Sequence, residues 1–441
     1  MKKLTTNLKQ KLIQQALLRK IKNVETDADT AALTLVSTKV AEKYYKFDQH
    51  PEYLKKQIIE TASVQMGIES PFFRVHEGVA GATTRIAGRE LINFASYNYL
   101  GFSGHPEINQ AAIDAIQQYG TSVSASRIVS GERAIHLQLE QDIADIYEVD
   151  AALVFVSGHA TNVSTLGFLF GSKDLIIHDE YTHNSAIVGA QLSGAKRIPF
   201  AHNDLDALDS LLTENRLQFE RVVIVVEGLY SMDGDCPDLT RLIELKKKHK
   251  VFLMVDEAHS FGVLGETGKG LREEYGVAGN DVDIWMGTLS KTLSGCGGYI
   301  AGGSALVENL RHFAPGFLYS VGIPAPTAAA AIKSLELMQR EPQRIAKLHK
   351  ISQYFLQQAK KHQLDVGESI GVAVVPIILG SSVKAARLSS FLIQEGINVQ
   401  PILYPAVPEK SARLRFFLSC EHTKQQIDHT LDKIKHALDT I

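Results

Sequence analysis

The sequence has few cysteines and no long apolar run. Its 441 residues include three cysteines, Cys236, Cys296 and Cys420, which lie far apart and lack the paired spacing of a metal site. We therefore expect no disulfide framework, no bound metal and a reducing, cytoplasmic location. No apolar stretch approaches the roughly 20 residues of a membrane-spanning helix, and the N-terminus lacks the apolar core of a signal peptide. These absences predict a chain without a transmembrane segment.

The chain also has no excess of positive charge. It contains 46 Lys and Arg against 49 Asp and Glu, a net charge of −3 that predicts no nucleic-acid partner. The string Asp256-Glu257-Ala258-His259 also marks the metal-binding acids of some helicases, but those proteins need an upstream phosphate loop. The nearest candidate, residues 265–270, lies downstream and follows its lysine with glycine. The dinucleotide fingerprint fails as well, because Ile300 stands where its last glycine belongs.

Strand-like and helical patterns alternate along most of the chain. Residues 105–119 place apolar side chains at helical spacing, and Gly120 would end that helix. Short apolar runs predict strands at residues 152–156, 175–177, 222–226, 251–255 and 299–301. This alternation predicts a layered α/β sheet. After about Ser320 the pattern changes to long helices with strands at 374–379, 398–400 and 414–418, which predicts a smaller α+β domain.

Lys291 is the most informative residue. It stands in Gly287-Thr288-Leu289-Ser290-Lys291-Thr292, between an apolar strand-like stretch and a glycine-rich run. A lysine between a buried strand and a flexible segment is well placed to lose solvation and form a Schiff base with a carbonyl cofactor, of which pyridoxal phosphate is the obvious one. A solvated surface lysine is the alternative.

Asp256 and His259 support the first interpretation. The continuous apolar run 251–255 indicates a strand covered on both faces, so Asp256 lies at its carboxyl end, where open α/β sheets bind ligands. A carboxylate there can pair with a pyridinium nitrogen and keep the ring an electron sink. His259 could hydrogen-bond the phenolic oxygen of the ring, or could be a satisfied histidine at a strand end.

These motifs in this order resemble the α-oxoamine synthases, which are fold-type I, aspartate-aminotransferase-like enzymes that use pyridoxal phosphate. The resemblance implies a mixed, mostly parallel sheet in a large α/β domain at 71–319, a small α+β domain at 320–441 and an N-terminal extension at 1–70. It runs from about Phe72 to the C-terminus and rests on six segments: Ser96-Tyr97-Asn98-Tyr99-Leu100-Gly101, Ser126-Arg127-Ile128-Val129-Ser130-Gly131, residues 179–185, residues 227–235, Asp256-Glu257-Ala258-His259 and Thr288-Leu289-Ser290-Lys291.

The resemblance implies a role for each residue that would meet the cofactor. Lys291 forms the Schiff base, Asp256 pairs with the pyridine nitrogen and His259 contacts the phenolic oxygen. His159 stacks on the outer face of the ring, although a loop histidine that caps the following helix is the alternative. The remaining cofactor-binding positions are Ser157 and Gly158 at a helix start that suits a phosphate, Ser185 beside His183 near the ring oxygen, Thr288 close to Lys291, and Ser320, which reaches the phosphate of a neighbouring subunit.

Two arginines could bind the carboxylate of the substrate. Arg413 and Arg415 lie on the same face of a predicted strand, so their spacing cannot distinguish them. The resemblance selects Arg415, whose planar guanidinium can bind a carboxylate bidentately, with Asn98 as a second substrate-binding residue. We expect Arg413 to be a solvated neighbour. Asp233-Gly234 is interpreted as a tight turn, and Cys296 as a small buried residue of the glycine-rich loop.

The activity implied by the resemblance is a decarboxylative condensation of a small L-amino acid with an acyl thioester in a homodimer with shared active sites. Ser126 stands where glycine-restricted members carry threonine, which favours alanine or serine over glycine. Residues 67–74 and 120–126 resemble members that act beside fatty-acid or polyketide assembly lines, so an acyl carrier protein could replace coenzyme A. An aminotransferase and a non-catalytic partner subunit are the alternatives; retention of Lys291 argues against the second.

The first residues are basic and are not explained by these motifs. Residues 1–23 carry seven Lys and Arg and no acid, with leucines near one helical face. A helix that binds a carrier protein, a membrane-surface anchor and a solvated terminal helix are the three interpretations.

Overall fold

The computed structural model describes residues 40–440. Residues 1–39, on which the prediction of a basic terminal helix falls, lie outside that range. None of the described helices is both long enough and apolar enough to cross a membrane.

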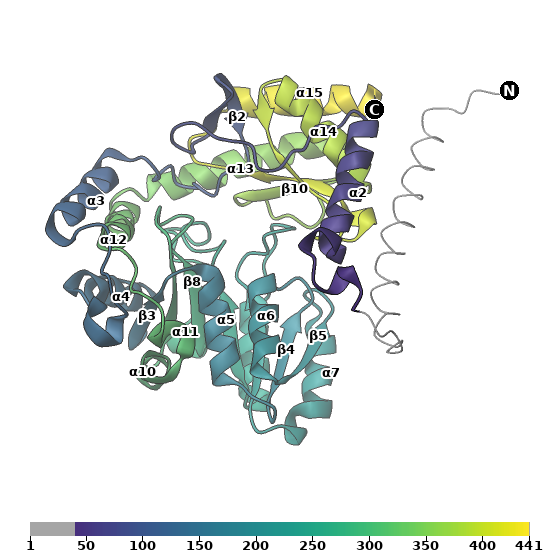
Figure 1. Ribbon diagram of the computed structural model, residues 1–441. Coiled ribbons are helices and arrows are strands. Elements are labelled where there is room, and N and C mark those ends of the chain that lie inside the picture. The colour runs from purple at the N-terminus through teal and green to yellow at the C-terminus, as the bar shows by residue number, and fades with distance from the viewer. Residues whose placement is uncertain (1–39, 441) are drawn as a thin grey trace.

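A seven-stranded mixed sheet forms the centre of the molecule (Figure 1). Its order is β3-β9-β8-β7-β6-β4-β5, and β9 runs antiparallel to both of its neighbours while the other pairs are parallel. This arrangement confirms the predicted mostly parallel α/β sheet, and every strand predicted before Ser320 lies within two residues of its predicted limits. The strands are β3 Ala151–Phe155, β4 Leu175–Asp179, β5 Lys196–Phe200, β6 Val222–Glu227, β7 Phe252–Asp256, β8 Ile284–Thr288 and β9 Gly298–Gly302.

Both faces of this sheet are covered because its strands are apolar on both sides. Val223 and Val225 point into one apolar core, which includes side chains of α5, α6, α10 and α11. Val222 and Ile224 point into the other, which includes side chains of α4, α7, α8 and α12. The helices are α4 Ala134–Tyr147, α5 Gly158–Leu169, α6 Asn184–Ser193, α7 Leu205–Asn215, α8 Leu239–His249, α9 Leu271–Tyr275, α10 Ser304–Phe313, α11 Pro315–Leu318 and α12 Ala325–Arg340.

The helix predicted at residues 105–119 is α3, Pro106–Tyr119. It begins at His105, whose side chain accepts a hydrogen bond from the Glu107 amide, and Pro106 occupies the first turn, where its missing N–H costs nothing. Gly120 ends it with a positive φ of 76°. The sequence signals for its start and stop are therefore confirmed.

The C-terminal part is built on two three-stranded sheets. One has the order β10-β13-β12 and is antiparallel; in the other, β1 and β2 from the N-terminal side join β11. The helices α13, α14 and α15 lie at the top of Figure 1, above the large sheet. The predicted domain limits, 1–70, 71–319 and 320–441, stay predictions. The elements are α2 Pro51–Gln65, β1 Thr83–Ile86, β2 Arg89–Asn93, α13 Gln343–Lys361, β10 Val374–Ile378, α14 Ser382–Gln394, β11 Ile397–Asn398, β12 Gln400–Ile402, β13 Arg413–Phe417 and α15 Lys424–Thr440.

Candidate active site

The carboxyl ends of neighbouring parallel strands bring the predicted residues to one edge of the sheet. β6 ends at Glu227 and β7 at Asp256, and these two residues face each other in the strand register. β8 ends at Thr288, three residues before Lys291. The prediction that Asp256 stands at the carboxyl end of a strand in the sheet interior is confirmed; the ligand-binding role of this edge stays a prediction.

Asp256 is held rigidly in the interior. Its Oδ1 accepts from the Ala258 amide at 3.0 Å, and its Oδ2 accepts from Asn162 Nδ2 at 2.8 Å. The same Asn162 nitrogen lies 2.9 Å from Ser185 Oγ. No sequence motif indicates Asn162, although its position three residues after His159 in α5 places both side chains on one helical face. A carboxylate fixed in this way keeps lone pairs for a cationic ring nitrogen.

The groups around Lys291 shift its pKa in opposite directions. Loss of hydration lowers the pKa of Lys291, the Asp256 carboxylate and the carboxyl group of Glu227 oppose this shift, and Arg415 adds to it; the net pKa is about 8. Its Nζ lies 5.4 Å from the centre of the Tyr97 ring. An amine with this pKa is about one-tenth neutral at pH 7, far more than an exposed lysine. Lys291 can therefore act as a nucleophile and as a base.

His259 is buried and is oriented by a tyrosine. Its Nδ1 lies 2.7 Å from the hydroxyl of Tyr99, and its ring stacks on Phe417 with centroids 6.0 Å apart. Burial lowers the pKa of His259 well below its ordinary value, and the nearby cations Lys291 and Arg415 add to this effect. The neutral ring therefore keeps Nε2 for a partner in the site. Tyr99 lies in one of the segments that carry the family resemblance, but no role was predicted for it.

His183 and Ser185 form a second side of the site. His183 caps α6, accepts from the Ser185 amide and lies 2.6 Å from Ser185 Oγ through its Nδ1. Burial lowers the pKa of His183, while Asp256 opposes that shift. His159 is exposed at the start of α5. Asn162 thus links the predicted positions Ser185 and Asp256, while the role of His159 stays a prediction.

The start of α5 has the features of an anion site. Ser157 caps the helix, accepting from the Ala160 amide at 3.0 Å, while the amides of Gly158 and His159 donate to no described group. Thr288 closes the other side: a Cβ on Gly158 would lie only 2.9 Å from its Oγ1. A 12-residue helix with two free amides and a nearby hydroxyl suits a phosphate.

Ser320 makes its side-chain hydrogen bond within its own segment and not with Lys291 or the start of α5. Its hydroxyl donates to the Gly316 carbonyl at 2.7 Å, and none of the hydrogen bonds among residues 40–440 links it to Lys291. Its segment pairs with the chain around Ser126, through an antiparallel bridge between Ser126 and Val321 and a bond from the Gly322 amide to Ala125. Tyr319 is 85% and Val321 48% exposed.

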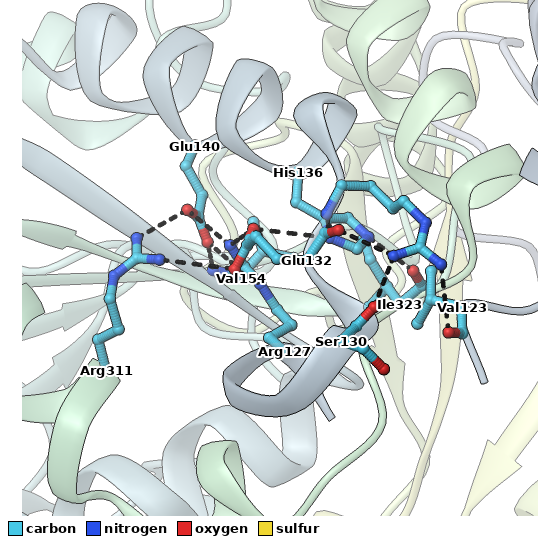
Figure 2. A network of polar contacts seen from close by, with 10 residues as sticks. Val123, Arg127, Ser130, Glu132, His136, Glu140, Val154, Arg311 and Ile323 are labelled. Atoms are coloured by element: carbon cyan, nitrogen blue, oxygen red, sulfur yellow. Dashed lines mark hydrogen bonds and ion pairs between the residues drawn. The ribbon is translucent and has the colours of Figure 1, made fainter. Parts of the chain in front are cut away.

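An ionic network, buried at Arg127 and Glu140 and partly exposed at Glu132 and Arg311, supports this segment (Figure 2). The Arg127 guanidinium pairs with Glu140 and, at 2.6 Å, with Glu132, and Arg311 pairs with Glu140 at 2.9 Å. Arg127 also covers the Phe317 ring at 5.3 Å. Two arginines and two glutamates therefore fasten the turn at Arg127–Gly131 and the chain near Ser320 to the core.

The two C-terminal arginines have separate partners. Arg413 is buried, 3% exposed, and its Nη1 lies 2.6 Å from Asp233 Oδ1. The expectation of a solvated Arg413 is therefore wrong, because an alternating strand on this face points inward at both positions. Asp233 does sit in a tight turn, where Gly234 has a φ of 72°, but its carboxylate is also the partner of Arg413.

Arg415 keeps donors for a ligand. Its Nη1 donates to the Ser231 carbonyl at 3.1 Å, while its Nε is buried with no acceptor among the described residues. Its guanidinium lies 4.6 Å from the Phe417 ring centre. Burial lowers the pKa of Arg415, and the guanidinium still carries its charge. A buried, unsatisfied donor on a fixed cation indicates a carboxylate site.

A histidine between two aspartates holds the loop that leads to His183. His202 lies 3.0 Å from Asp179 at the end of β4 and 2.8 Å from Asp235. Burial lowers the pKa of His202, but the hydrogen bonds and charges of the two aspartates outweigh it and raise the pKa to about 10. An imidazolium therefore ties the loop after β4 to the turn that carries Asp233.

Asn98 and Cys296 lie in surroundings that differ from the predicted ones. Asn98 is buried, but its amide is occupied by the chain: Nδ2 donates to the Ala80 carbonyl at 3.0 Å, and Oδ1 accepts from the Ser103 amide at 3.1 Å. These contacts brace a loop and do not support the predicted substrate contact; Tyr97 is the residue of this motif beside Lys291. Cys296 is exposed, so the prediction of a buried thiol is wrong.

Together these residues fit pyridoxal phosphate. The amides at the start of α5 suit its phosphate, the fixed Asp256 carboxylate suits its ring nitrogen, and Lys291 suits its aldehyde. His259 would face an oxygen of the ring with its free nitrogen. Arg415 remains for an acidic group of a second molecule.

Comparisons with known proteins agree with this geometry. The sequence profile of the family "Aminotransferase class I and II" matches residues 89–434. The chain is 41% identical to 8-amino-7-oxononanoate synthase of Symbiobacterium thermophilum, over 78% of this chain and 88% of that protein, and 35% identical to 8-amino-7-oxononanoate synthase 1 of Bacillus subtilis, over 80% and 90%. A solved structure of serine palmitoyltransferase from Sphingomonas wittichii superposes with a TM-score of 0.84 at 28% identity, covering 90% of this chain and 98% of that one.

Proposed function

The chain belongs to the α-oxoamine synthases of the aminotransferase class I and II family, which are acyltransferases that use pyridoxal phosphate, and we propose that it condenses alanine or serine with an acyl thioester. The observation that carries this proposal is the separation of two roles in the site. Lys291 and Asp256 form a cofactor site, and Arg415 offers an unsatisfied donor to the carboxylate of an amino acid.

The names of the two kinds of relative each point to an amino acid with a side-chain carbon on its α-carbon. Serine, named in serine palmitoyltransferase, has a hydroxymethyl group there, and 8-amino-7-oxononanoate has a methyl group at the carbon next to its ketone. Glycine has neither. This supports alanine or serine as the amino acid, in agreement with the small side chain of Ser126. The acyl chain is carried on coenzyme A or on an acyl carrier protein.

Pyridoxal phosphate, when bound, supplies an aldehyde for the amino group and a ring that accepts the electron pair of the α-carbon. Arg415 orients the amino acid through its carboxylate. The neutral amine of Lys291 removes the α-proton. The α-carbon then attacks the acyl carbon, the carbon–sulfur bond breaks and the thiol leaves; loss of the carboxylate as carbon dioxide and return of a proton give the α-aminoketone. His159, which is exposed at the start of α5, would cover the reacting face of the ring.

We also infer that two copies share their sites. Arg127 packs against Phe317 in the segment near Ser320. Tyr319 and Val321 of this segment are exposed, as are Ile128 and Val129 of the paired chain. A second copy that covers these side chains would receive Ser320 near its own cofactor phosphate. Sedimentation of the protein at micromolar concentration should give twice the mass of one chain, and a monomer that binds cofactor fully would contradict this inference.

The experiment that tests the function is thiol release from an acyl thioester. Purified protein with pyridoxal phosphate is mixed with palmitoyl-coenzyme A or with an acyl carrier protein thioester, and with alanine, serine or glycine in turn. We expect thiol release that depends on alanine or serine and exceeds that with glycine. Release that is equal with and without any amino acid would contradict the proposal.

A further inference from the structure

One carboxyl group in the site has no task in the scheme above. Glu227 ends β6 beside Asp256 and is 3% exposed. Its Oε2 accepts a long hydrogen bond from the Ser231 amide at 3.3 Å. Its Oε1 is buried and has no hydrogen-bond partner among residues 40–440. A buried polar atom without a partner is costly, so its position calls for an explanation.

Charged, titratable and backbone polar groups from several elements interact with Glu227. They are Asp256 from β7, Lys291 from the loop after β8, Arg415 from β13, the backbone at His183, and Tyr230 from its own loop. Burial, followed by the Asp256 carboxylate, raises the pKa of Glu227 to about 8, while the Ser231 amide, Lys291 and the backbone amide of His183 oppose the shift. At pH 7 this side chain is therefore a neutral acid, which can donate one hydrogen bond.

We propose that Glu227 is a further binding residue of the site, and that its unpartnered oxygen carries a hydrogen donated to an anionic oxygen of the molecule held between Lys291 and Arg415. The inference rests on the proposed function, because that molecule is the cofactor or the amino acid. The anionic oxygen belongs either to the ring of the cofactor or to the substrate carboxylate. Asp256 cannot fill this role, since it accepts hydrogen bonds with both oxygens.

The proposal has a pH consequence with a fixed sign. The folded-state pKa of Glu227 is raised, so its neutral form predominates below about pH 8 and is lost as the pH rises through that value. An ionised Glu227 would repel the anionic oxygen instead of binding it. Affinity should then fall by up to about tenfold for each pH unit above that value. Lys291 acts in the opposite direction, because its neutral form, which reacts with an aldehyde, increases with pH.

The test compares Glu227→Gln, which keeps a donor but cannot ionise, with Glu227→Leu, which removes it. The matched control is Glu257→Gln. Glu257 follows Asp256, is also buried, and has its pKa raised to about 7 by burial, but its carboxylate is already satisfied by the Ser260 hydroxyl and, at 2.9 Å, by the Leu271 amide. It therefore shares the chemistry of Glu227 without facing the site.

Two dissociation constants are measured between pH 6.5 and 9. The first is that of pyridoxal phosphate for apoprotein, from the quenching of protein fluorescence; the second is that of alanine or serine for the cofactor-loaded protein, from its absorbance. We expect the ratio of wild-type to Glu227→Gln constants to rise above pH 8 for one of these ligands, and Glu227→Leu to bind that ligand about tenfold or more weakly at pH 7. The ligand that responds identifies the acceptor: pyridoxal phosphate indicates the ring oxygen, the amino acid indicates its carboxylate.

Parallel pH profiles for wild type and Glu227→Gln with both ligands would overturn the proposal, as would an equal change in Glu257→Gln. If Glu227→Leu does not fold, Glu227→Gln alone decides, since it is nearly isosteric. The outcome is independent of turnover. A protein that binds both ligands as expected but releases no thiol would refute the proposed function and leave Glu227 in place.

Discussion

Replacement of Arg415 should weaken the binding of the amino acid far more than that of the cofactor. Its Nη1 is already used by the Ser231 carbonyl, so the ligand would be held by the remaining donors, including the buried Nε. A charge-assisted hydrogen bond contributes about 1.5–3 kcal/mol. Arg415→Met loses two of them, about 3 kcal/mol or more, which is over a hundredfold in affinity. Arg415→Lys keeps a point charge but loses the second bond, so about tenfold is expected.

The assay is a spectroscopic titration of the cofactor-loaded protein with alanine or serine. Arg413 provides the matched control, because it lies two residues away on the same strand and is satisfied by Asp233. Arg413→Met should lower the free energy of unfolding, by breaking a buried ion pair, while the remaining folded protein binds the amino acid within about threefold of wild type. Unchanged affinity in Arg415→Met, or an equal loss in Arg413→Met, would refute the assignment.

Three other perturbations have defined outcomes. The pKa of His202 is raised to about 10, above its unfolded value, so its contribution to stability is complete below about pH 6.5 and is lost as the pH rises through 10. The difference in free energy of unfolding between wild type and His202→Gln should therefore shrink between pH 6.5 and 10. A difference that grows over this interval would contradict the linkage. Arg127→Met leaves the buried Glu140 with Arg311 as its one cation and should cost about 3–5 kcal/mol in urea unfolding; a loss below about 1 kcal/mol would mean that the network is not stabilising. Gly158→Ala should weaken pyridoxal phosphate binding about tenfold, because its Cβ would lie 2.9 Å from Thr288 Oγ1; Gly167→Ala in the same helix, whose Cβ would make ordinary contacts at 3.6 Å, is the control and should bind normally.

The sequence predicted the large sheet well because its strands are short, apolar on both faces and bounded by turns. The run 251–255 could be placed within one residue, and with it the position of Asp256, because a strand buried on both sides has no competing interpretation of similar length. The joining of β2 with β11 could not be foreseen. Those residues are some 300 positions apart, and short half-buried strands carry little information about their partners.

Within the site, the sequence motifs predict the residues that would meet the cofactor, but not the residues that orient them by hydrogen bonds. Asn162 and Tyr99 act through hydrogen bonds to Asp256 and His259, and polar side chains in a helix or loop give no sign of such partners before the fold is known. Arg413 illustrates the reverse error: alternation correctly placed it on the face of Arg415, but only the structure shows that Asp233 comes from a distant turn to pair with it.

The central claim is that the amino acid loses its carboxylate while its α-carbon gains an acyl group. The most direct test supplies alanine or serine labelled with carbon-13 in the carboxyl group, together with an acyl thioester, and follows the label by mass spectrometry. We predict that the label leaves as carbon dioxide, that the product is an unlabelled α-aminoketone, and that Lys291→Ala gives neither. A labelled keto acid, which an aminotransferase would form, would contradict the account.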